Sequence, residues 1–287
     1  MGSKVPERFA DRLAAAVAER SSQIVLGLDP DPARVWPEVE TQQGEPAARI
    51  AAQSRALIEA AGAACVAVKL QLACYERVGA GGFEAARATV DAARSRGLLV
   101  LLDGKRGDIG VTAAAYADAL YDALGGDAVT ANPLLGRDAL EPLLDRGGTF
   151  VLVRTSNPGA AELQDAMLAD GGTVSERLAA MVDELGAQRT GDSGLSDVGA
   201  VVGATVPEQL ERLRGLMPRA PILLPGVGAQ GGRVEEVAAA WGPGRAAALV
   251  TASRSIAWAH EERGGPPGET AAAAAEQLRI AAWAASS

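Results

Sequence analysis

The sequence is poor in residue types on which many enzymes depend. Aromatic residues make up 3% of its 287 positions, and it has one histidine and two cysteines. Cys65 and Cys74 lie within apolar sequence, so we expect no disulfide scaffold and two buried thiols in a reducing cytoplasm. The one histidine, His260, stands in the polar stretch AHEER, where a surface position is expected. Histidine-based catalysis is therefore not expected.

Long apolar runs and positive charge are also missing. No stretch of 18 apolar residues occurs and no basic segment leads into an apolar one, so neither a membrane span nor a signal peptide is expected. The formal net charge of −9 argues against nucleic acid as a partner, because that would require a basic surface. No cluster of histidine, cysteine and carboxylate residues with metal-ligand spacing is present, so no metal site is predicted.

Lysine is scarce, although basic residues are not. Of the 27 basic residues only Lys4, Lys69 and Lys105 are lysines, so arginine carries nearly all of the surface positive charge. Lys69 and Lys105 follow apolar, strand-like runs, where a surface role fits poorly. Burial and neighbouring charges can bring the pKa of a lysine within reach of proton transfer, which is not so for arginine. These two lysines are candidate catalytic residues.

Short apolar runs rich in Val, Ile and Leu predict eight strands. They cover residues 23–29, 64–70, 98–103, 127–132, 149–155, 197–203, 221–226 and 247–252. Intervening segments such as 84–96 and 207–217 have the i, i+3, i+4 apolar spacing of helices. Strands that alternate with helices pair in parallel through right-handed crossovers.

This α/β pattern predicts one (β/α)8 TIM barrel over residues 1–287, since about 250 residues is typical of that fold. An extra N-terminal helix at about 6–20 and a polar loop at about 189–197 account for the remainder. A doubly wound open sheet is the alternative, but no GxGxxG follows the first strand. In a barrel, catalytic residues belong at the carboxyl ends of the strands.

The stretch LLVLLDGKRGDIG (98–110) carries the strongest functional signal. Residues two apart in a strand point the same way, so Asp103 and Lys105 are expected to share a face. With Lys69 from the neighbouring strand and Asp108 from the following loop, they form a possible Lys–Asp–Lys–Asp array. A purely structural ion-pair network is the alternative. Clustered titratable groups favour a functional site, because buried ion pairs are a weak source of stability.

Two loops at the same end of the barrel predict a phosphate site. A glycine-rich turn (224–233) follows the seventh strand, and ASRSI (252–256) follows the eighth. Barrels commonly bind phosphate in these two loops through backbone N–H groups. Arg254 can bind a phosphate through two parallel hydrogen bonds. A plain glycine-rich loop is the alternative.

Taken in order, these motifs resemble the orotidine 5'-phosphate decarboxylase family. DGKRGDI (103–109) looks like its DxKxxDI signature. The resemblance continues through VKLQLACYE around Lys69, NPLLG (132–136), RTSNPGA (154–160), VGAT (202–205), LPGVGAQGG (224–232) and SRSI (253–256). It spans all eight predicted strands, and NPLLG and TSNPG are similar to the longer-chain, type 2 branch.

The resemblance implies decarboxylation of orotidine 5'-phosphate to uridine 5'-phosphate without a cofactor, the last step of de novo pyrimidine nucleotide synthesis. It implies that Lys105 donates the proton to C6 of the pyrimidine and that Asp103 lies against the substrate carboxylate. Lys69 would bridge the ribose and the charged array. The chemistry agrees: loss of CO2 leaves a carbanion that the ring cannot delocalise well, and a lysine aimed at C6 stabilises that charge and then protonates it.

The resemblance also implies a homodimer and further substrate contacts. Asp108, Ile109 and Thr112 would reach into the site of the other subunit. The remaining implied contacts are Asp29 with the ribose hydroxyls, Ser156 with the pyrimidine edge, Pro225 beside the base, and Gln230 and Arg254 with the phosphate. Ser253 stands where many relatives have glycine, but its backbone N–H can still bind phosphate. Arg106 has no predicted role.

Two other functions stay open at this point. One is a magnesium-dependent sugar-phosphate decarboxylase or aldolase of the same barrel group, whose members resemble one another in DxKxxD. Those relatives carry an acidic metal ligand near the end of the second strand, where this chain has Lys69. The other is a non-catalytic nucleotide-binding barrel, in which replacing Lys105 would change nothing.

Overall fold

The strands form a closed parallel barrel. The structure is a computed structural model that describes residues 7–40, 44–227 and 231–287. Strand order follows the chain, and β8 pairs with β1 to close the barrel. The strands are β1 (Ile24–Leu28), β2 (Ala67–Gln71), β3 (Leu99–Arg106), β4 (Ala128–Ala131), β5 (Gly148–Arg154), β6 (Val198–Val202), β7 (Ile222–Leu224) and β8 (Ala248–Ala252). The predicted (β/α)8 fold is confirmed, and the open sheet is excluded because β1 and β8 are neighbours.

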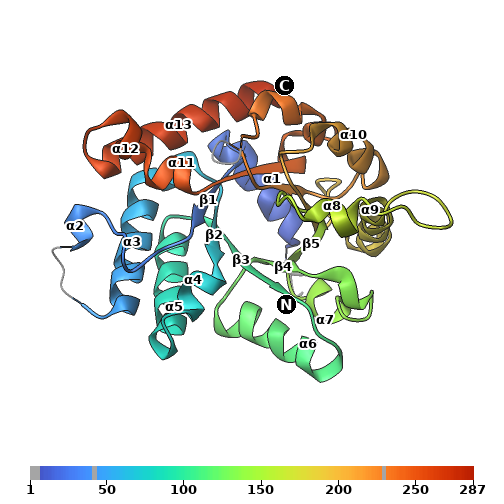
Figure 1. Cartoon of the computed structure of the whole chain (residues 1–287), viewed down its shortest axis with the longest axis horizontal. Helices are drawn as coiled ribbons and strands as arrows, with labels where there is room; N and C mark the ends of the chain where they lie inside the picture. The colour runs from blue at the N-terminus through green and yellow to red at the C-terminus, as the bar shows by residue number, and fades with distance from the viewer. Residues whose placement is uncertain (1–6, 41–43, 228–230) are drawn as a thin grey trace, which may run out of the picture.

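Helices surround the strands on their outer side (Figure 1). The longer ones are α3 (Pro46–Ala61), α5 (Ala80–Ser95), α6 (Gly110–Ala117), α9 (Val174–Gly186), α10 (Pro207–Leu216) and α13 (Pro267–Ala285). Short ones are α2 (Pro37–Glu40), α4 (Leu72–Glu76), α7 (Glu141–Leu144), α8 (Ala160–Gln164), α11 (Arg254–Ala257) and α12 (Ala259–Arg263). The 3-10 segments are Gly62–Ala64, Pro133–Leu135, Ala187–Arg189, Val234–Trp241 and Arg245–Ala247, and Asp118–Ala123 is π-helical. In the described part of the chain, no helix is both long and apolar enough to cross a bilayer.

The barrel has two apolar layers. Outward-facing strand residues such as Val68 and Leu102 belong to one large buried cluster with Ile58 of α3 and Val90 of α5. Inward-facing residues such as Leu101 form a second cluster inside the barrel. Burial on both faces explains why the strands read as continuous apolar runs rather than as alternating ones.

The N-terminal helix α1 (Phe9–Arg20) closes one end of the barrel. Phe9 and Leu13 are buried in the inner cluster. The ring of Phe9 meets that of Phe150 edge-on, with centroids 6.0 Å apart. Gly148 makes room for this contact, because a Cβ there would lie 2.3 Å from the Phe9 ring. The predicted N-terminal helix is therefore an apolar plug at the amino ends of the strands.

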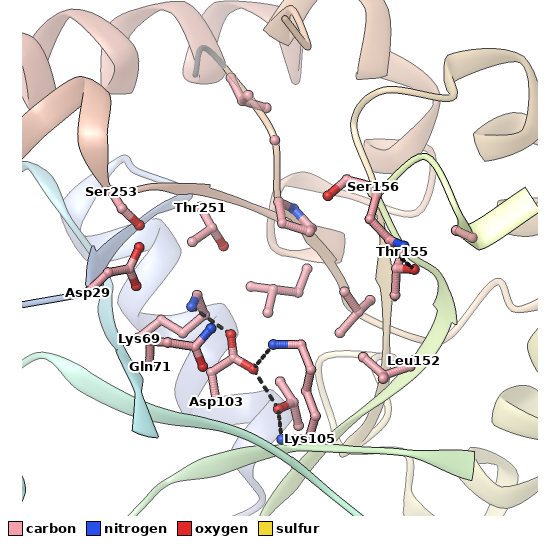
Figure 2. Close-up of a pocket in the computed structure, with 18 of the residues that line it drawn as sticks. Asp29, Lys69, Gln71, Asp103, Lys105, Leu152, Thr155, Ser156, Thr251 and Ser253 are labelled. Atoms are coloured by element: carbon pink, nitrogen blue, oxygen red, sulfur yellow. Dashed lines mark hydrogen bonds and ion pairs between the residues drawn. The ribbon is translucent and has the colours of Figure 1, made fainter. Parts of the chain in front are cut away.

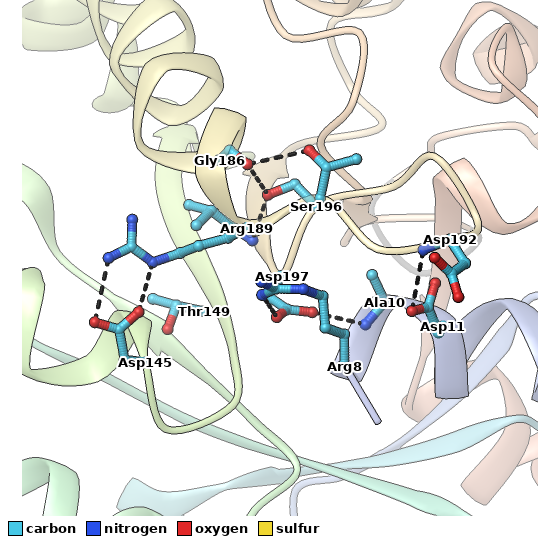
Figure 3. A network of polar contacts seen from close by, with 12 residues as sticks. Arg8, Ala10, Asp11, Asp145, Thr149, Gly186, Arg189, Asp192, Ser196 and Asp197 are labelled. Atoms are coloured by element: carbon cyan, nitrogen blue, oxygen red, sulfur yellow. Dashed lines mark hydrogen bonds and ion pairs between the residues drawn. The ribbon is translucent and has the colours of Figure 1, made fainter. Parts of the chain in front are cut away.

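The polar loop before β6 holds this plug in place (Figure 3). The Asp197 carboxylate accepts a hydrogen bond from the backbone N–H of Ala10 at 2.9 Å. The Asp11 carboxylate of α1 accepts from the backbone N–H groups of Asp192 and Ser193, at 3.2 and 2.8 Å. The sequence predicted this segment only as a polar loop without a function, and the structure shows that its hydrogen bonds hold α1 against the barrel.

Candidate active site

A cavity of about 570 Å³ opens at the carboxyl ends of the strands (Figure 2). Its floor and walls come from all eight strands or the residues that follow them. Among its lining residues are Asp29, Lys69, Asp103, Lys105, Thr130, Ser156, Pro225, Thr251, Ser253 and Arg254. The end of the barrel opposite to the α1 plug is therefore the one that can bind a ligand, as the position of the charged residues predicts.

Three charged side chains meet at the floor of the cavity. The ammonium of Lys69 donates to Oδ2 of Asp103 at 2.7 Å, and that of Lys105 donates to Oδ1 at 2.6 Å. The side chains of Lys69 and Asp103 are each 8% exposed, whereas that of Lys105 is 42% exposed. Lys105 is thus the cation that faces the open cavity, with the buried pair behind it.

The electrostatics of this cluster hold Asp103 and Lys69 ionised at neutral pH. Burial disfavours the Asp103 carboxylate, but Lys69 and Lys105 outweigh burial and lower its pKa to about 2. Burial also opposes the charge of Lys69, yet Asp103 and Asp29 together raise its pKa above the ordinary value. The cluster is a preorganised set of fixed charges, as catalysis by electrostatic stabilisation requires.

Asp103 and Lys105 meet, as expected from the sequence, but β3 is not a regular strand at this point. β3 does not end at 103 but runs to Arg106, and its pairing with β4 is irregular between Leu102 and Arg106. Within this bulge Lys105 has a φ of +47°, in the left-handed region that non-glycine residues rarely adopt. A bulge re-aims a side chain next to a site. Here the Lys105 ammonium lies against Asp103 within this bulge rather than at a regular strand end.

Most predicted substrate contacts lie around the cavity. Asp29 and Ser253 lie on one side of it and Ser156 on the other (Figure 2), with Pro225 and Arg254 also in the lining. The side chain of Ser253 fills the space beside Gly27, where a Cβ would lie 1.9 Å from the serine Oγ. Two residues that sequence reasoning missed, Gln71 and Thr130, also line the cavity. Gln230 lies outside the described residues.

Asp108 does not join the cluster within one chain. Its carboxylate accepts a hydrogen bond from the N–H of Ile109 at 2.8 Å and is absent from the cavity lining. Ile109 and Thr112 are exposed. Three members of the array therefore meet within one chain, and Asp108, which the resemblance assigns to the site of the other subunit, is not among them.

Arg106 acts outside the cavity. Its guanidinium pairs with Glu76, at the end of α4, and lies 5.3 Å from the centre of the Tyr116 ring in α6. It therefore connects the two helices that flank β3. Arg106, for which the sequence predicted no role, thus makes a packing contact between α4 and α6 in this chain.

The histidine and cysteine predictions need small corrections. His260 is half-buried rather than exposed, with its ring 5.9 Å from that of Trp258, and it does not line the cavity. Cys65 is buried, and burial raises its pKa to about 12, but Cys74 is only half-buried. Over residues 7–40, 44–227 and 231–287, no group of three or more His, Cys, Asp or Glu side chains is arranged to hold a metal ion.

Comparisons with known proteins agree on one family. A family model described as "Orotidine 5'-phosphate decarboxylase / HUMPS family" matches residues 22–264. An orotidine 5'-phosphate decarboxylase of Rhodopirellula baltica is 41% identical over 270 residues, which cover 88% of this chain and 89% of that protein. One of Deinococcus radiodurans is 40% identical over 277 residues, covering 94% and 96%. The solved structure of Leishmania donovani OMP decarboxylase is 30% identical, with a TM-score of 0.77, and the match covers 97% of this chain and 98% of that one.

Proposed function

This chain belongs to the orotidine 5'-phosphate decarboxylase / HUMPS family, and we infer that it converts orotidine 5'-phosphate to uridine 5'-phosphate. It is a carboxy-lyase of pyrimidine synthesis that performs the last step of the de novo route. The observation that carries this conclusion is the ion cluster of Lys69, Asp103 and Lys105 at the floor of an open cavity. Fixed charge of this kind is what a decarboxylation without an electron-accepting cofactor needs.

Lys105 is proposed as the proton donor. When the bond from C6 to the carboxylate breaks, its electron pair stays on C6 and CO2 leaves. The ammonium of Lys105 stabilises that negative charge and then gives C6 its proton, which leaves a neutral amine. The exposure of Lys105 to the cavity and its contact with Asp103 support this role.

Asp103 and Lys69 are proposed to act on the bound substrate through their charges. A carboxylate at the position of Asp103 would oppose the substrate carboxylate in the ground state, and the opposition ends as CO2 departs. The low pKa of Asp103 supports this role, because the group stays charged at neutral pH. Lys69 would keep Asp103 ionised and reach toward the ribose.

The remaining contacts are proposed from the rim of the cavity. Asp29 would bind the ribose hydroxyls, Ser156 the edge of the base, and Pro225 would pack beside it. Arg254, the N–H of Ser253, and Gln230 would bind the phosphate. The separation of Asp29 and Ser253 from Ser156 across the cavity (Figure 2) supports a ligand that spans it. Binding energy from a distant phosphate can be used to position C6 at Lys105.

A homodimer is proposed to complete the site. Asp108 and Thr112 of one subunit would contact the substrate held by the other, with Ile109 beside them. Four exposed apolar side chains near Asp108 support a covered surface there: Ile109, Val111, Leu134 and Leu135. Exposed apolar groups of this size are favoured at protein interfaces.

Complementation between two inactive variants tests the shared site. Lys105→Ala lacks the proton donor, and Asp108→Ala lacks the group lent to the partner. In a random mixture of the two chains, half of the dimers are mixed and each mixed dimer keeps one intact site. We therefore expect about a quarter of the native activity, as symmetric dimers predict. A mixture as inactive as its two components would contradict a site shared between subunits.

The magnesium-dependent alternative is not favoured. The family description covers HUMPS members as well, but the named relatives are orotidine 5'-phosphate decarboxylases. Lys69 lies in β2, where the resemblance places an acidic metal ligand in the magnesium enzymes. A cation at this position repels a divalent metal ion.

A direct assay decides between these functions. Purified protein is mixed with orotidine 5'-phosphate, and the change in absorbance on decarboxylation is followed with and without EDTA. We expect turnover in both conditions, which supports a cofactor-free reaction. Absence of turnover by folded protein would overturn the proposed function, and turnover lost with EDTA would favour the magnesium-dependent class.

Two further properties belong to the same proposal. We propose that residues 1–287 form a single barrel domain, which is supported by α1 packing into the barrel interior. We propose a cytoplasmic location, which is supported by two free cysteines, because free thiols are typical of reducing compartments.

A further inference from the structure

Thr130 of β4 lies between the two residues on which the proposed reaction depends. Its Oγ accepts a hydrogen bond from the backbone N–H of Lys105 at 2.9 Å and donates one to Oδ1 of Asp103 at 2.8 Å. We propose that Thr130 is a positioning residue for the decarboxylation: its hydroxyl sets the backbone of Lys105 and the orientation of the Asp103 carboxylate. This inference rests on the proposed function.

The direction of the two hydrogen bonds follows from their chemistry. A hydroxyl has one proton, and the N–H of Lys105 can only donate. The proton of Thr130 must therefore go to Asp103, whose Oδ1 also accepts from the Lys105 ammonium. One carboxylate oxygen is thus held between Thr130 and Lys105, and the other accepts from Lys69. Both oxygens of Asp103 are fixed, so its plane cannot rotate freely.

The backbone of Lys105 needs such a contact. The left-handed conformation is strained for a non-glycine residue, and Lys105 adopts it at a φ of +47°. In the β3–β4 ladder, Leu102 pairs with Val129 and Arg106 with Ala131, so the bulge takes the residues between them out of regular pairing. The regular ladder is interrupted at Lys105, and its backbone N–H donates to the hydroxyl of Thr130 instead of to a strand carbonyl. A local strain of this kind persists only where the surroundings hold it.

A purely structural role for a buried threonine is the simpler explanation. A second buried threonine, Thr149, is an example of such a role. Thr149 of β5 is fully buried, and its hydroxyl bonds to the carbonyl of Leu143 and to the hydroxyl of Tyr121. None of these groups lines the cavity. Thr130 is 1% exposed, and it is the one polar residue in β4, but both of its partners belong to the ion cluster. The two threonines therefore form a matched pair for an experiment.

The test compares Thr130→Val, Thr130→Ser and Thr149→Val in steady-state decarboxylation and thermal unfolding. Valine keeps the shape of threonine and removes the hydroxyl. For Thr130→Val we expect kcat to fall about 100-fold, as misplacement of catalytic groups by about 1 Å does, with KM within about threefold of native. Thr130→Ser keeps the hydroxyl and should hold kcat within about fivefold of native. Thr149→Val should lower the unfolding temperature and leave kcat unchanged.

Three results would overturn the inference. One is a Thr130→Val enzyme with native kcat, and another is a Thr130→Ser enzyme as impaired as Thr130→Val. The third is a loss of kcat in Thr149→Val equal to that in Thr130→Val, because a general loss of stability would then explain both. If Thr130→Val does not fold, the kcat of Thr130→Ser, which keeps a hydroxyl, is compared with that of Thr130→Ala, which lacks one. A native protein without turnover overturns the proposed function as well, whereas an active native protein beside an equally active Thr130→Val overturns this inference alone.

Discussion

The two ends of the barrel are built from opposite chemistry. At the amino ends of the strands, α1 inserts Phe9 and Leu13 into an apolar interior, and its polar groups are hydrogen-bonded to the loop before β6. At the carboxyl ends, charges crowd around Asp103, and Lys105 has a left-handed backbone beside an open cavity. Packing at the amino end of the barrel stabilises the fold and offsets the cost of backbone strain and clustered charge at the carboxyl end. Substitutions at the two ends should therefore separate activity from stability.

The largest effect is expected at the carboxyl end, from Lys105→Ala. Loss of the proton donor and of charge stabilisation should lower kcat by at least about 10⁴-fold, because each contributes roughly 10²-fold or more. The side chain is 42% exposed, so the unfolding temperature should change little. Single-turnover kinetics and calorimetry measure the two quantities. A matching fall in stability would show that the two ends are not separate.

Phe9→Ala should give the reverse result at the amino end. Removing a buried aromatic ring from a packed interior costs about 3–5 kcal/mol of unfolding free energy, and Phe9 is 2% exposed. The kcat of the folded fraction should stay native. Urea unfolding measures the loss, with Phe83→Ala as the control, since Phe83 is 45% exposed. A stability loss no larger than that of the control would contradict a plug that stabilises the barrel.

The charge cluster should contribute to stability in a pH-dependent way. The pKa of Asp103 falls from an ordinary 3.8 to about 2 in the folded protein, because Lys69 and Lys105 outweigh burial. A lowered pKa stabilises the fold above pH 3.8, and this contribution is lost as the pH falls toward 2. The native protein should lose about 2 kcal/mol relative to Asp103→Asn over this window. Urea unfolding from about pH 5 downward tests this, and a constant difference between the proteins would contradict it.

The smallest effect is expected from Asp11→Ala. This change removes the acceptor for two backbone N–H groups in the loop before β6 and should cost about 1 kcal/mol. The unfolding temperature should fall by a few degrees without any change in kcat. Glu19→Ala is the control, because Glu19 is exposed on the same helix. Equal effects of the two changes would mean that the loop does not fasten α1.

The fold and the main charged cluster were predictable because they depend on repeated, local features. Apolar runs and helical spacing predict the eight strands, and Lys69, Asp103 and Lys105 stand out because lysine is scarce. The bulge in β3 was not predictable in this way. DGKR reads as an ordinary alternating strand end, since alternation alone already places Asp103 and Lys105 on one face.

Thr130 was missed for a related reason. A threonine in the run DAVTAN carries no sign of its hydrogen-bond partners, which lie 25 and 27 positions earlier in the chain. The fastening of α1 by the loop before β6 was missed because Asp11 and Ser193 are 182 positions apart. In both cases the partner is decided by the register between elements that are distant in sequence.

The sequence by itself determined which elements form and which chemical groups stand at the strand ends, because hydrophobic periodicity and residue type act locally. Only the tertiary structure decided how those groups are held. Closing the barrel set the register of β3 against β4, and that register turned the Lys105 backbone left-handed and brought Thr130 against both it and Asp103. Hydrogen bonds depend on distance and angle, and these exist only once the distant segments have met.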